Sequence, residues 1–284
     1  MIANPARHDL RFGKAPRDAA PRAKVRGRMR FRRFLLLLIL AVLAIRSFVF
    51  SPFSIPSESM MPGLLAGDVL IAAKWPYGWS RWSLPFAPSL IDGRLAPRLP
   101  ARGDVAIFRH PVDHREYIKR VIALPGDRVV IRGGSPVIDG AKASSNSIAD
   151  FSLPVSGAAR TPCAWGGSME RAGNGVRQCR YRQFRETLPG GASYPVLDFG
   201  TTPQDNFAAV TVPPGHVFML GDNRDNSLDS RFPARAGGGV GLVPTNLLVA
   251  RAELVAFSSD GSARWYDPVS WIAAVRWNRI GKRL

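Results

Sequence analysis

The chain has 284 residues, enough to bury a full hydrophobic core as one large domain or two smaller ones. Its net charge of +18 is unevenly distributed, because residues 1–33 hold 11 Lys and Arg against two Asp and so contribute +9. No pattern of interleaved aromatic and basic residues accompanies this segment, which argues against nucleic acid as its partner and favours anionic lipid.

The first 45 residues combine a basic segment with an apolar one. Residues 1–33 are basic and Pro-rich, a composition typical of a disordered, solvated tail. Residues 34–45 are 12 consecutive apolar residues. As a helix these would span only about 18 Å, short of the roughly 30 Å hydrocarbon core. A run of this length is also typical of a cleavable signal peptide.

Apolar residues resume after Arg46 and continue to Phe53, which brings the segment to the roughly 20 residues of a full span. No clean small-x-small cleavage pair follows, and Arg46 could snorkel to the headgroups. We therefore expect residues 34–53 to form one uncleaved transmembrane anchor. The positive-inside rule then places the tail 1–33 in the cytoplasm and everything after about residue 53 outside, with membrane lipids as a partner.

Residues 56–64 follow the expected anchor directly and present two hydroxyls two residues apart, Ser57 and Ser59, with a proline on each side. This pattern predicts a fixed loop that presents a serine. A serine is a weak nucleophile until a base takes its proton, so the loop is catalytic only if such a base exists. For Glu58, between the two serines, the sequence indicates no role.

The remainder of the chain is predicted to be mainly β. Short β-branched runs bounded by Gly, Pro and Asp predict strands at residues 68–72, 104–108, 117–123, 128–131 and 216–220. Few windows longer than ten residues show helical spacing. We therefore expect an antiparallel β-sheet body built from hairpins and long loops.

A change in composition divides this body. Residues 132–212 are rich in Gly, Ser, Pro, Arg and Thr with weak periodicity, which predicts an inserted, smaller β/loop domain between the two parts of the main body, 54–131 and 213–284. The insertion holds Cys163 and Cys179, which are too few for a zinc site of the usual kind. In an oxidising compartment they could form a disulfide worth about 3 kcal/mol, which we expect because the region is poor in core residues; two unpaired thiols are the alternative.

Two further segments each have two interpretations. Residues 74–86 hold five aromatic residues beside basic ones, an arrangement that suits the membrane interface and equally an aromatic cluster packed on the sheet. Residues 271–283 are typical of a short basic amphipathic helix against lipid, or of a frayed tail.

Histidine is one candidate base for the serine. Beyond the expected anchor, the chain contains His110, His114 and His216. Chain position does not exclude a Ser/His/Asp triad, because triads are defined by geometry. However, no Gly-x-Ser-x-Gly elbow surrounds Ser59.

Lysine is the other candidate. Arg cannot give up its proton in a protein, whereas a desolvated Lys can act as a base. Beyond the anchor and away from the C-terminus the choice is among Lys74, Lys119 and Lys142, and only Lys119 lies inside an apolar predicted strand. Because strand side chains alternate, Lys119 shares a face with Tyr117, and its neighbour Arg120 is expected to be the solvent-facing charge.

Residues 221–231 are dense in Asp, Asn and Ser. A calcium loop is disfavoured because Arg224 occupies the middle and the late bidentate Glu is absent. A hydrogen-bonded turn, in which Asp229 pairs with Arg231 and Ser227 points inward, uses these residues better.

Four of these motifs, in this order behind an apolar segment, resemble bacterial type I signal peptidases: residues 56–62, 102–105, 117–127 and 221–231. The resemblance extends from the expected anchor to about residue 257. It implies the signal peptidase fold, a membrane-anchored serine endopeptidase, and no metal or organic cofactor. The cysteine pair also falls where some members carry a disulfide.

The resemblance also implies residue roles. Ser59 matches the nucleophile and Lys119 the general base. Ser57 matches the side-chain donor of the oxyanion hole, which the backbone N–H of Ser59 completes. The supporting residues that it implies are Ser227, which orients the lysine, and the pair Asp229 and Arg231.

The implied reaction is removal of N-terminal signal peptides from exported preproteins through an acyl-enzyme. The implied substrates bind as extended strands with small residues at P1 and P3, and the implied location is the bacterial inner membrane, with one span and a periplasmic body. Two other classes remain as alternatives. One is a catalytically silent, membrane-anchored peptide-binding module of the same fold, and the other is a self-cleaving Ser/Lys peptidase of the repressor type, which would lack this anchor.

Overall fold

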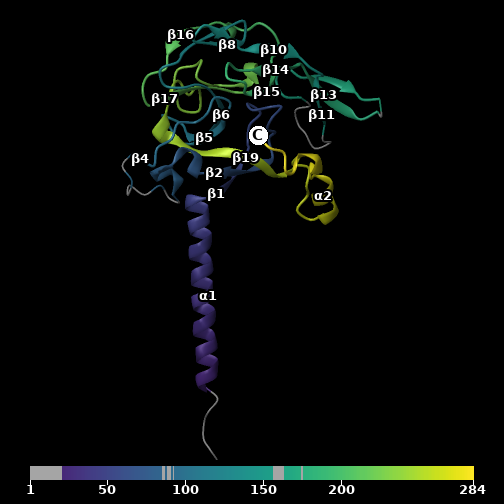
Figure 1. Cartoon of the computed structure of the whole chain (residues 1–284). Helices are drawn as coiled ribbons and strands as arrows, with labels where there is room; N and C mark the ends of the chain where they lie inside the picture. The colour runs from purple at the N-terminus through teal and green to yellow at the C-terminus, as the bar shows by residue number, and fades with distance from the viewer. Residues whose placement is uncertain (1–20, 85–86, 88–90, 92, 156–162, 174) are drawn as a thin grey trace, which may run out of the picture. The chain divides into compact units, whose positions relative to one another are not determined.

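The computed structural model describes residues 21–84, 87, 91, 93–155, 163–173 and 175–284. The chain divides into two compact units, Met1–Ala44 and Ile45–Leu284. Helix α1, Pro21–Phe48, begins in the first unit and ends in the second. The second unit contains every described strand, so the fold is mainly β as predicted (Figure 1).

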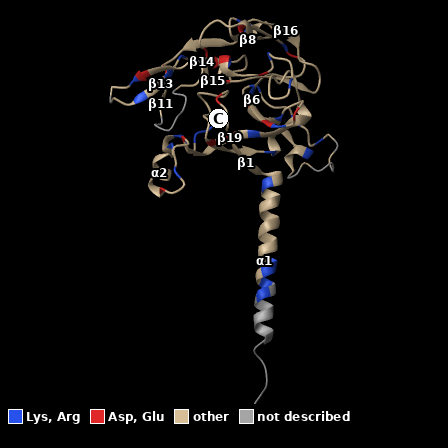
Figure 2. Ribbon diagram, turned by 180° about the vertical axis from the view of Figure 1, so that it is seen from behind, with Lys and Arg blue, Asp and Glu red and all other residues tan. Residues whose placement is uncertain are grey.

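Helix α1 is 28 residues long and includes the apolar run 34–45. Leu, Ala and Arg are strong helix formers, which explains why the basic and apolar segments join in one helix. Basic residues precede the apolar run, and Arg46 follows it (Figure 2). Within the described part of the chain, no helix is both long enough and apolar enough to cross a membrane.

Two boundaries differ from those predicted. Of the expected disordered tail 1–33, residues 1–20 lie outside the described residues, and residues 21–33 are helical, because Ala, Arg, Lys and Met there continue the helix. The expected anchor 34–53 is divided, since α1 ends at Phe48 and strand β1 occupies Phe50–Ser54. Pro52 lies inside β1 and cannot continue a helix.

The largest sheet has seven strands, each antiparallel to its neighbours. Its central strands, β5 and β6, are buried along most of their length, which places β6 between layers of apolar side chains. In sheet order the strands are β1 (Phe50–Ser54), β2 (Asp68–Ala73), β19 (Leu248–Ser258), β5 (Val105–Arg109), β6 (Glu116–Ala123), β17 (His216–Leu220) and β18 (Val243–Pro244).

Smaller antiparallel sheets complete the body, and three of them lie together on the side away from β1 (Figure 1). The first contains β16 (Phe207–Thr211), β7 (Arg128–Arg132), β8 (Ser135–Ile138) and β9 (Ala141–Lys142). The second contains β10 (Ser144–Ser147), β14 (Gln183–Thr187) and β15 (Ser193–Leu197). The third contains β11 (Phe151–Pro154), β13 (Arg177–Tyr181) and β12 (Ser168–Arg171). The fourth pairs β3 (Trp79–Ser80) with β4 (Arg94–Leu95). All five predicted strands are present, as β2, β5, β6, β7 and β17.

The expected insertion 132–212 forms most of these small sheets, but its boundaries do not separate it from the body. Strand β7, which crosses the first boundary of the insertion, pairs with β8 and β16 inside it. All of these residues belong to the same compact unit, Ile45–Leu284. The change in composition therefore predicted where most of the small sheets lie, but it did not predict a domain boundary.

The remaining described helices are short: α2 (Pro268–Ala273) and the 3-10 turns η1 (Trp75–Tyr77), η2 (Arg81–Ser83), η3 (Pro203–Asp205), η4 (Arg224–Asn226), η5 (Thr245–Leu247) and η6 (Trp277–Arg279). In the aromatic tract 74–86, of which residues 85–86 lie outside the described residues, Tyr77 is buried in the core and Trp75 packs edge-on against Phe50 at 4.9 Å. The tract is therefore packed on the body, one of its two predicted interpretations. The segment 271–283 is neither one helix nor a frayed tail, because η6 and the residues after it bind along β19.

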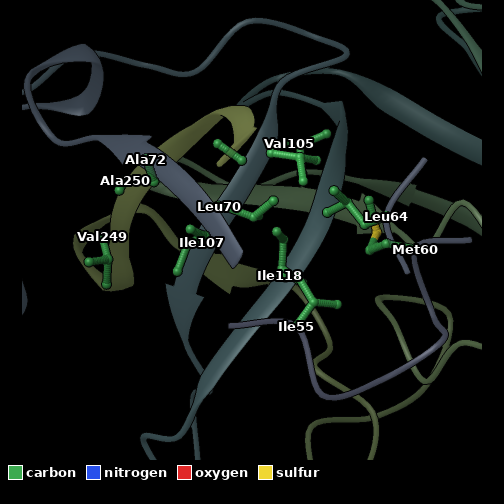
Figure 3. Close-up of a cluster of buried hydrophobic side chains, with 12 residues drawn as sticks. Ile55, Met60, Leu64, Leu70, Ala72, Val105, Ile107, Ile118, Val249 and Ala250 are labelled. Atoms are coloured by element: carbon green, nitrogen blue, oxygen red, sulfur yellow. The ribbon is translucent and has the colours of Figure 1, made fainter. Parts of the chain in front are cut away.

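One core cluster supports the serine loop directly. Met60 and Leu64, which follow Ser59, lie among buried side chains of β2, β5, β6 and β19 (Figure 3). Both are at most 1% exposed. The loop that presents Ser59 is thus an extension of the core and not a surface excursion.

The cysteines of the insertion are joined. Cys163 and Cys179 form a disulfide with a Cα–Cα distance of 5.4 Å, as expected. Cys179 is buried in the cluster that contains Met61 and Leu65 from the serine loop. The disulfide therefore fixes a part of the insertion that packs behind this loop.

Candidate active site

Ser59 lies at the start of a turn between β1 and β2. The Met61 N–H donates to the Glu58 carbonyl at 3.0 Å, and the Leu64 N–H donates to the Met60 carbonyl at 2.9 Å. The Asn223 N–H donates to the Ser59 carbonyl at 3.1 Å. These bonds and the buried apolar side chains of the turn fix the backbone that carries the serine.

The structure brings Ser59 and Lys119 together from 60 residues apart in sequence. Lys119 Nζ donates to Ser59 Oγ at 2.7 Å. Ser57 Oγ lies 3.4 Å from Ser59 Oγ, on the same side of the loop. His110 is buried elsewhere, and its ring Nε2 bonds the Gly239 carbonyl at 3.1 Å. The basic side chain that contacts the serine is therefore the lysine.

Burial lowers the pKa of Lys119 from 10.5 to about 8, because the charged ammonium loses its hydration. The negative charges of Asp229 and Asp222 act in the opposite direction and keep the pKa of Lys119 from falling further. A lysine with this pKa is partly neutral near physiological pH and can accept a proton from the hydroxyl that it contacts.

A second lysine has the same perturbation without the same contact. Lys74 is 5% exposed, and burial lowers its pKa to about 8 as well. Its Nζ donates to the carbonyl of Ser83. Sequence patterns placed Lys74 in a loop and missed this burial, because the segment that covers it folds by irregular aromatic packing.

The three supporting residues lie behind this pair. Arg231 donates to both oxygens of Asp229, at 2.8 and 2.9 Å, as the turn pattern predicted. Asp229 also accepts from the Gly221 N–H at 3.1 Å. Ser227 Oγ is buried without a hydrogen-bond partner among the described residues, so its implied bond to Lys119 is not formed here.

Gly221 sits in a gap that no larger residue fits. A Cβ there would lie 2.2 Å from Ser227 Oγ and 2.6 Å from the Ser59 carbonyl oxygen. The segment 221–231 therefore approaches the serine loop through its backbone, which brings Ser227 beside Ser59.

The expectation that Arg120 faces solvent is wrong. Arg120 is 6% exposed, and its side chain forms two bonds to Asp222, at 2.7 and 2.6 Å. The Arg120 guanidinium also lies 4.0 Å from the ring centroid of Tyr194. Both faces of β6 are covered, so strand alternation could not tell which charge was solvated.

A further buried pair was missed by sequence reasoning. Arg224, whose position in the sequence disfavoured a calcium loop, donates to Glu186 of β14 at 2.7 and 2.5 Å. Both side chains are nearly inaccessible to solvent. Glu186 comes from the weakly periodic insertion, where no local pattern marks it as a partner.

A cavity of about 560 Å³ opens over Ser59 and Lys119. Residues of two strands line it, Phe53 and Ser54 of β1 and Glu116–Lys119 of β6. Its wall includes both loop serines, the lysine and the unpartnered hydroxyl, together with apolar groups: Phe53, Ile55, Ser57, Ser59, Tyr117, Lys119, Ser227 and Leu228. The cavity can thus hold an extended peptide against the hydroxyl and the amine.

Known proteins resemble this chain over most of its length. The family described as signal peptidase, peptidase S26, matches residues 28–257. Signal peptidase I of Rickettsia prowazekii (strain Madrid E) is 32% identical over 269 residues, covering 87% of this chain and 90% of that protein. Signal peptidase I of Rickettsia bellii (strain OSU 85-389) is 32% identical over 279 residues, covering 89% and 84%.

Among solved structures, a signal peptidase I from Enterococcus faecalis V583 has 22% sequence identity and a TM-score of 0.28, covering 54% of this chain and 97% of that one. The family match extends over most of the chain and includes all four motifs. The two Rickettsia proteins match over nearly their whole length. The chain therefore belongs to the signal peptidase family, peptidase S26, and is a serine peptidase, a hydrolase.

Proposed function

We propose that this peptidase removes N-terminal signal peptides from exported preproteins with a Ser59–Lys119 dyad. The observation that carries the proposal is the 2.7 Å contact between Lys119 Nζ and Ser59 Oγ in a buried setting. The buried lysine supplies the base, and the fixed turn supplies the nucleophile.

In the proposed reaction, neutral Lys119 takes the proton of Ser59, whose oxygen attacks the scissile carbonyl carbon. Collapse of the tetrahedral intermediate breaks the peptide C–N bond, and the Lys119 ammonium gives its proton to the leaving amine. The neutral Lys119 amine then deprotonates a water, whose oxygen attacks the acyl-enzyme carbonyl. As the ester bond to Ser59 breaks, the Lys119 ammonium returns the proton to Ser59 Oγ, which releases the signal peptide and restores the serine.

Two donors are assigned to the oxyanion. They are the hydroxyl of Ser57, whose oxygen lies 3.4 Å from Ser59 Oγ, and the backbone N–H of Ser59. One such donor is typically worth about 10²- to 10³-fold in turnover. Ser227, with its unpartnered hydroxyl in the cavity wall, is assigned to orient the lysine amine, and the Asp229–Arg231 pair fixes the segment that carries it.

The proposed substrate is an extended segment with small residues at P1 and P3. Among the described residues, β17 pairs with β6 from Arg120 to Ala123, so Glu116–Lys119 pair with β5 alone. Strand β1 likewise pairs with β2 alone. A peptide added to these free edges gains main-chain hydrogen bonds along the cavity that holds Ser59.

The proposed location is the bacterial inner membrane, with helix α1, which contains the apolar run 34–45, as a single-pass anchor, a cytoplasmic N-terminus and a periplasmic body. The exposed apolar side chains of residues 34–45 and the basic residues before them support this. Lipids are then a second partner. We expect the chain to resist alkaline extraction from membranes, and we expect protease to reach the body from the periplasmic side only.

Single-turnover cleavage of a membrane-embedded preprotein tests the dyad. Lys119→Met has a similar length and no base, so cleavage should be lost, as in Ser59→Ala. Lys74→Met is the matched control, because it also removes a buried lysine with a pKa of about 8 but one bonded to a backbone carbonyl. Full cleavage by folded Lys119→Met would sink the proposal.

A further inference from the structure

The last ten residues, 275–284, bind along β19 and reach the catalytic loop. The Gly281 N–H donates to the Val255 carbonyl at 2.8 Å, and the Leu284 N–H donates to the Glu253 carbonyl at 3.2 Å. The Leu284 side chain packs against the core cluster that holds the serine turn. Backbone hydrogen bonds to β19 and the packing of Leu284 therefore both fix this segment, independently of its charged side chains.

Arg279, in η6, extends from this segment to the turn that follows Ser59. Its Nη2 donates to the Gly63 carbonyl at 3.0 Å, and its Nε and Nη2 donate to the two carboxylate oxygens of Asp68 at 3.0 and 2.5 Å. Arg279 is 7% exposed and Asp68 is fully buried. A bidentate pair between Arg and a carboxylate fixes the relative orientation of the two side chains in addition to pairing their charges.

Asp68 ties the far end of the same turn. Its carboxylate accepts from the Leu65 N–H at 2.8 Å and from Ser258 Oγ of β19 at 2.6 Å. The Arg279 guanidinium thus binds the turn at Gly63, whose carbonyl also accepts from Lys282 Nζ at 3.3 Å, and, through Asp68, it binds the turn at Leu65 and at the start of β2.

Gly63 also lies close to Asp222. A Cβ on Gly63 would lie 3.2 Å from Asp222 Oδ2, the carboxylate that pairs with Arg120 beside Lys119. Gly63 is therefore bonded to the Arg279 guanidinium and lies next to the carboxylate that pairs with Arg120, the neighbour of Lys119 on β6. Displacement of Gly63 would shift the serine turn relative to the lysine.

We propose that Arg279 is a positioning residue for Ser59, which holds the nucleophile turn at its distance from Lys119. The inference rests on the proposed Ser59–Lys119 dyad. Arg279 acts through the Gly63 carbonyl and Asp68 and touches no reacting atom. A misplacement of about 1 Å can lower turnover by about 100-fold, so even a small relaxation of the turn is measurable.

The test compares Arg279→Gln, Arg279→Lys and Arg283→Gln in the full-length protein in detergent, with a preprotein substrate. Gln removes the charge and the fork, and kcat is expected to fall at least about tenfold while KM changes less than about twofold. The pH midpoint of the reaction should stay near 8, because the burial of Lys119 is untouched. Arg279→Lys keeps one cationic donor and should recover part of the loss. Arg283, exposed in the same segment, is the matched control and should cleave like wild type.

Amide hydrogen exchange over residues 60–66 supplies a readout other than activity. Exchange there should be faster in Arg279→Gln and unchanged in Arg283→Gln. If the Gln variant does not fold, Arg279→Lys takes its place, with a lower kcat, an unchanged KM and faster exchange expected. Wild-type kcat, or wild-type exchange, in the folded variant overturns the positioning role. Loss of cleavage by wild type itself, or its persistence in Lys119→Met, would refute the proposed function instead.

Discussion

Raising the pH from 7 to 9 tests the assignment of Lys119 without altering a residue. The proposed base works only as the neutral amine, and burial places its pKa at about 8. Its neutral fraction is then about 9% at pH 7 and about 91% at pH 9. We expect kcat/KM to rise about tenfold over this range, with a midpoint near pH 8.

Burial increases the fraction of Lys119 that is neutral and able to act as a base. With the ordinary pKa of 10.5, only about 0.03% of Lys119 would be neutral at pH 7, so the lower value raises the reactive fraction about 300-fold. If Lys119 were solvated, activity would instead continue to rise towards pH 10.

The assay is kcat/KM for one preprotein, measured between pH 6 and 10 in wild type and in Lys74→Met. Lys74 has a pKa of about 8 too, so the control decides which lysine the profile reports. The midpoint should persist in Lys74→Met. A flat profile between pH 7 and 9, a midpoint near 10.5, or loss of the midpoint in Lys74→Met would each refute the assignment.

Three further outcomes are expected. Lys119→Met should be more stable than wild type at pH 7 by about 3 kcal/mol, the free energy equivalent to the fall in the pKa of Lys119 from 10.5 to about 8. Urea unfolding should show this difference in stability shrinking between pH 8 and 10.5, because folded Lys119 is neutral there while the unfolded chain still binds the proton. Gly221→Ala should lower kcat/KM at least about tenfold, because the new methyl group displaces Ser227 or the Ser59 carbonyl; a Gly221→Ala enzyme with wild-type kinetics would contradict the packing described. Replacing Cys163 and Cys179 by Ser should lower stability by about 3 kcal/mol in oxidising buffer and by nothing in reducing buffer, where wild type has lost the bridge as well.

The parts of the fold that the sequence predicted are those with local causes. Strands β2, β5, β6, β7 and β17 are β-branched runs between turn residues, and both features act within a few residues. The end of helix α1 was harder to predict from the sequence. Apolar residues continue past Phe48, whereas the backbone changes there from helix to strand β1, which pairs with β2. Composition alone does not distinguish a continued helix from an edge strand.

The charged network could not be predicted for a different reason. Arg120 and Asp222 are 102 residues apart, and Arg224 and Glu186 are 38 apart, in segments of different pattern. A buried ion pair is tolerated only when geometry and additional hydrogen bonds offset desolvation, and those depend on the complete fold. Without the fold, an arginine in a strand is most simply assigned to solvent.

The two buried lysines show what turns burial into chemistry. Lys74 and Lys119 both have a pKa near 8 for the same reason, loss of hydration. Lys74 donates to a backbone carbonyl, which has no proton to give, whereas Lys119 contacts a serine hydroxyl, which has. A lowered pKa is therefore necessary for a lysine base but does not identify one. What selects Lys119 is the sheet order that places β6 beside the turn after β1, and any change that moves this turn should reduce turnover while leaving the pKa in place.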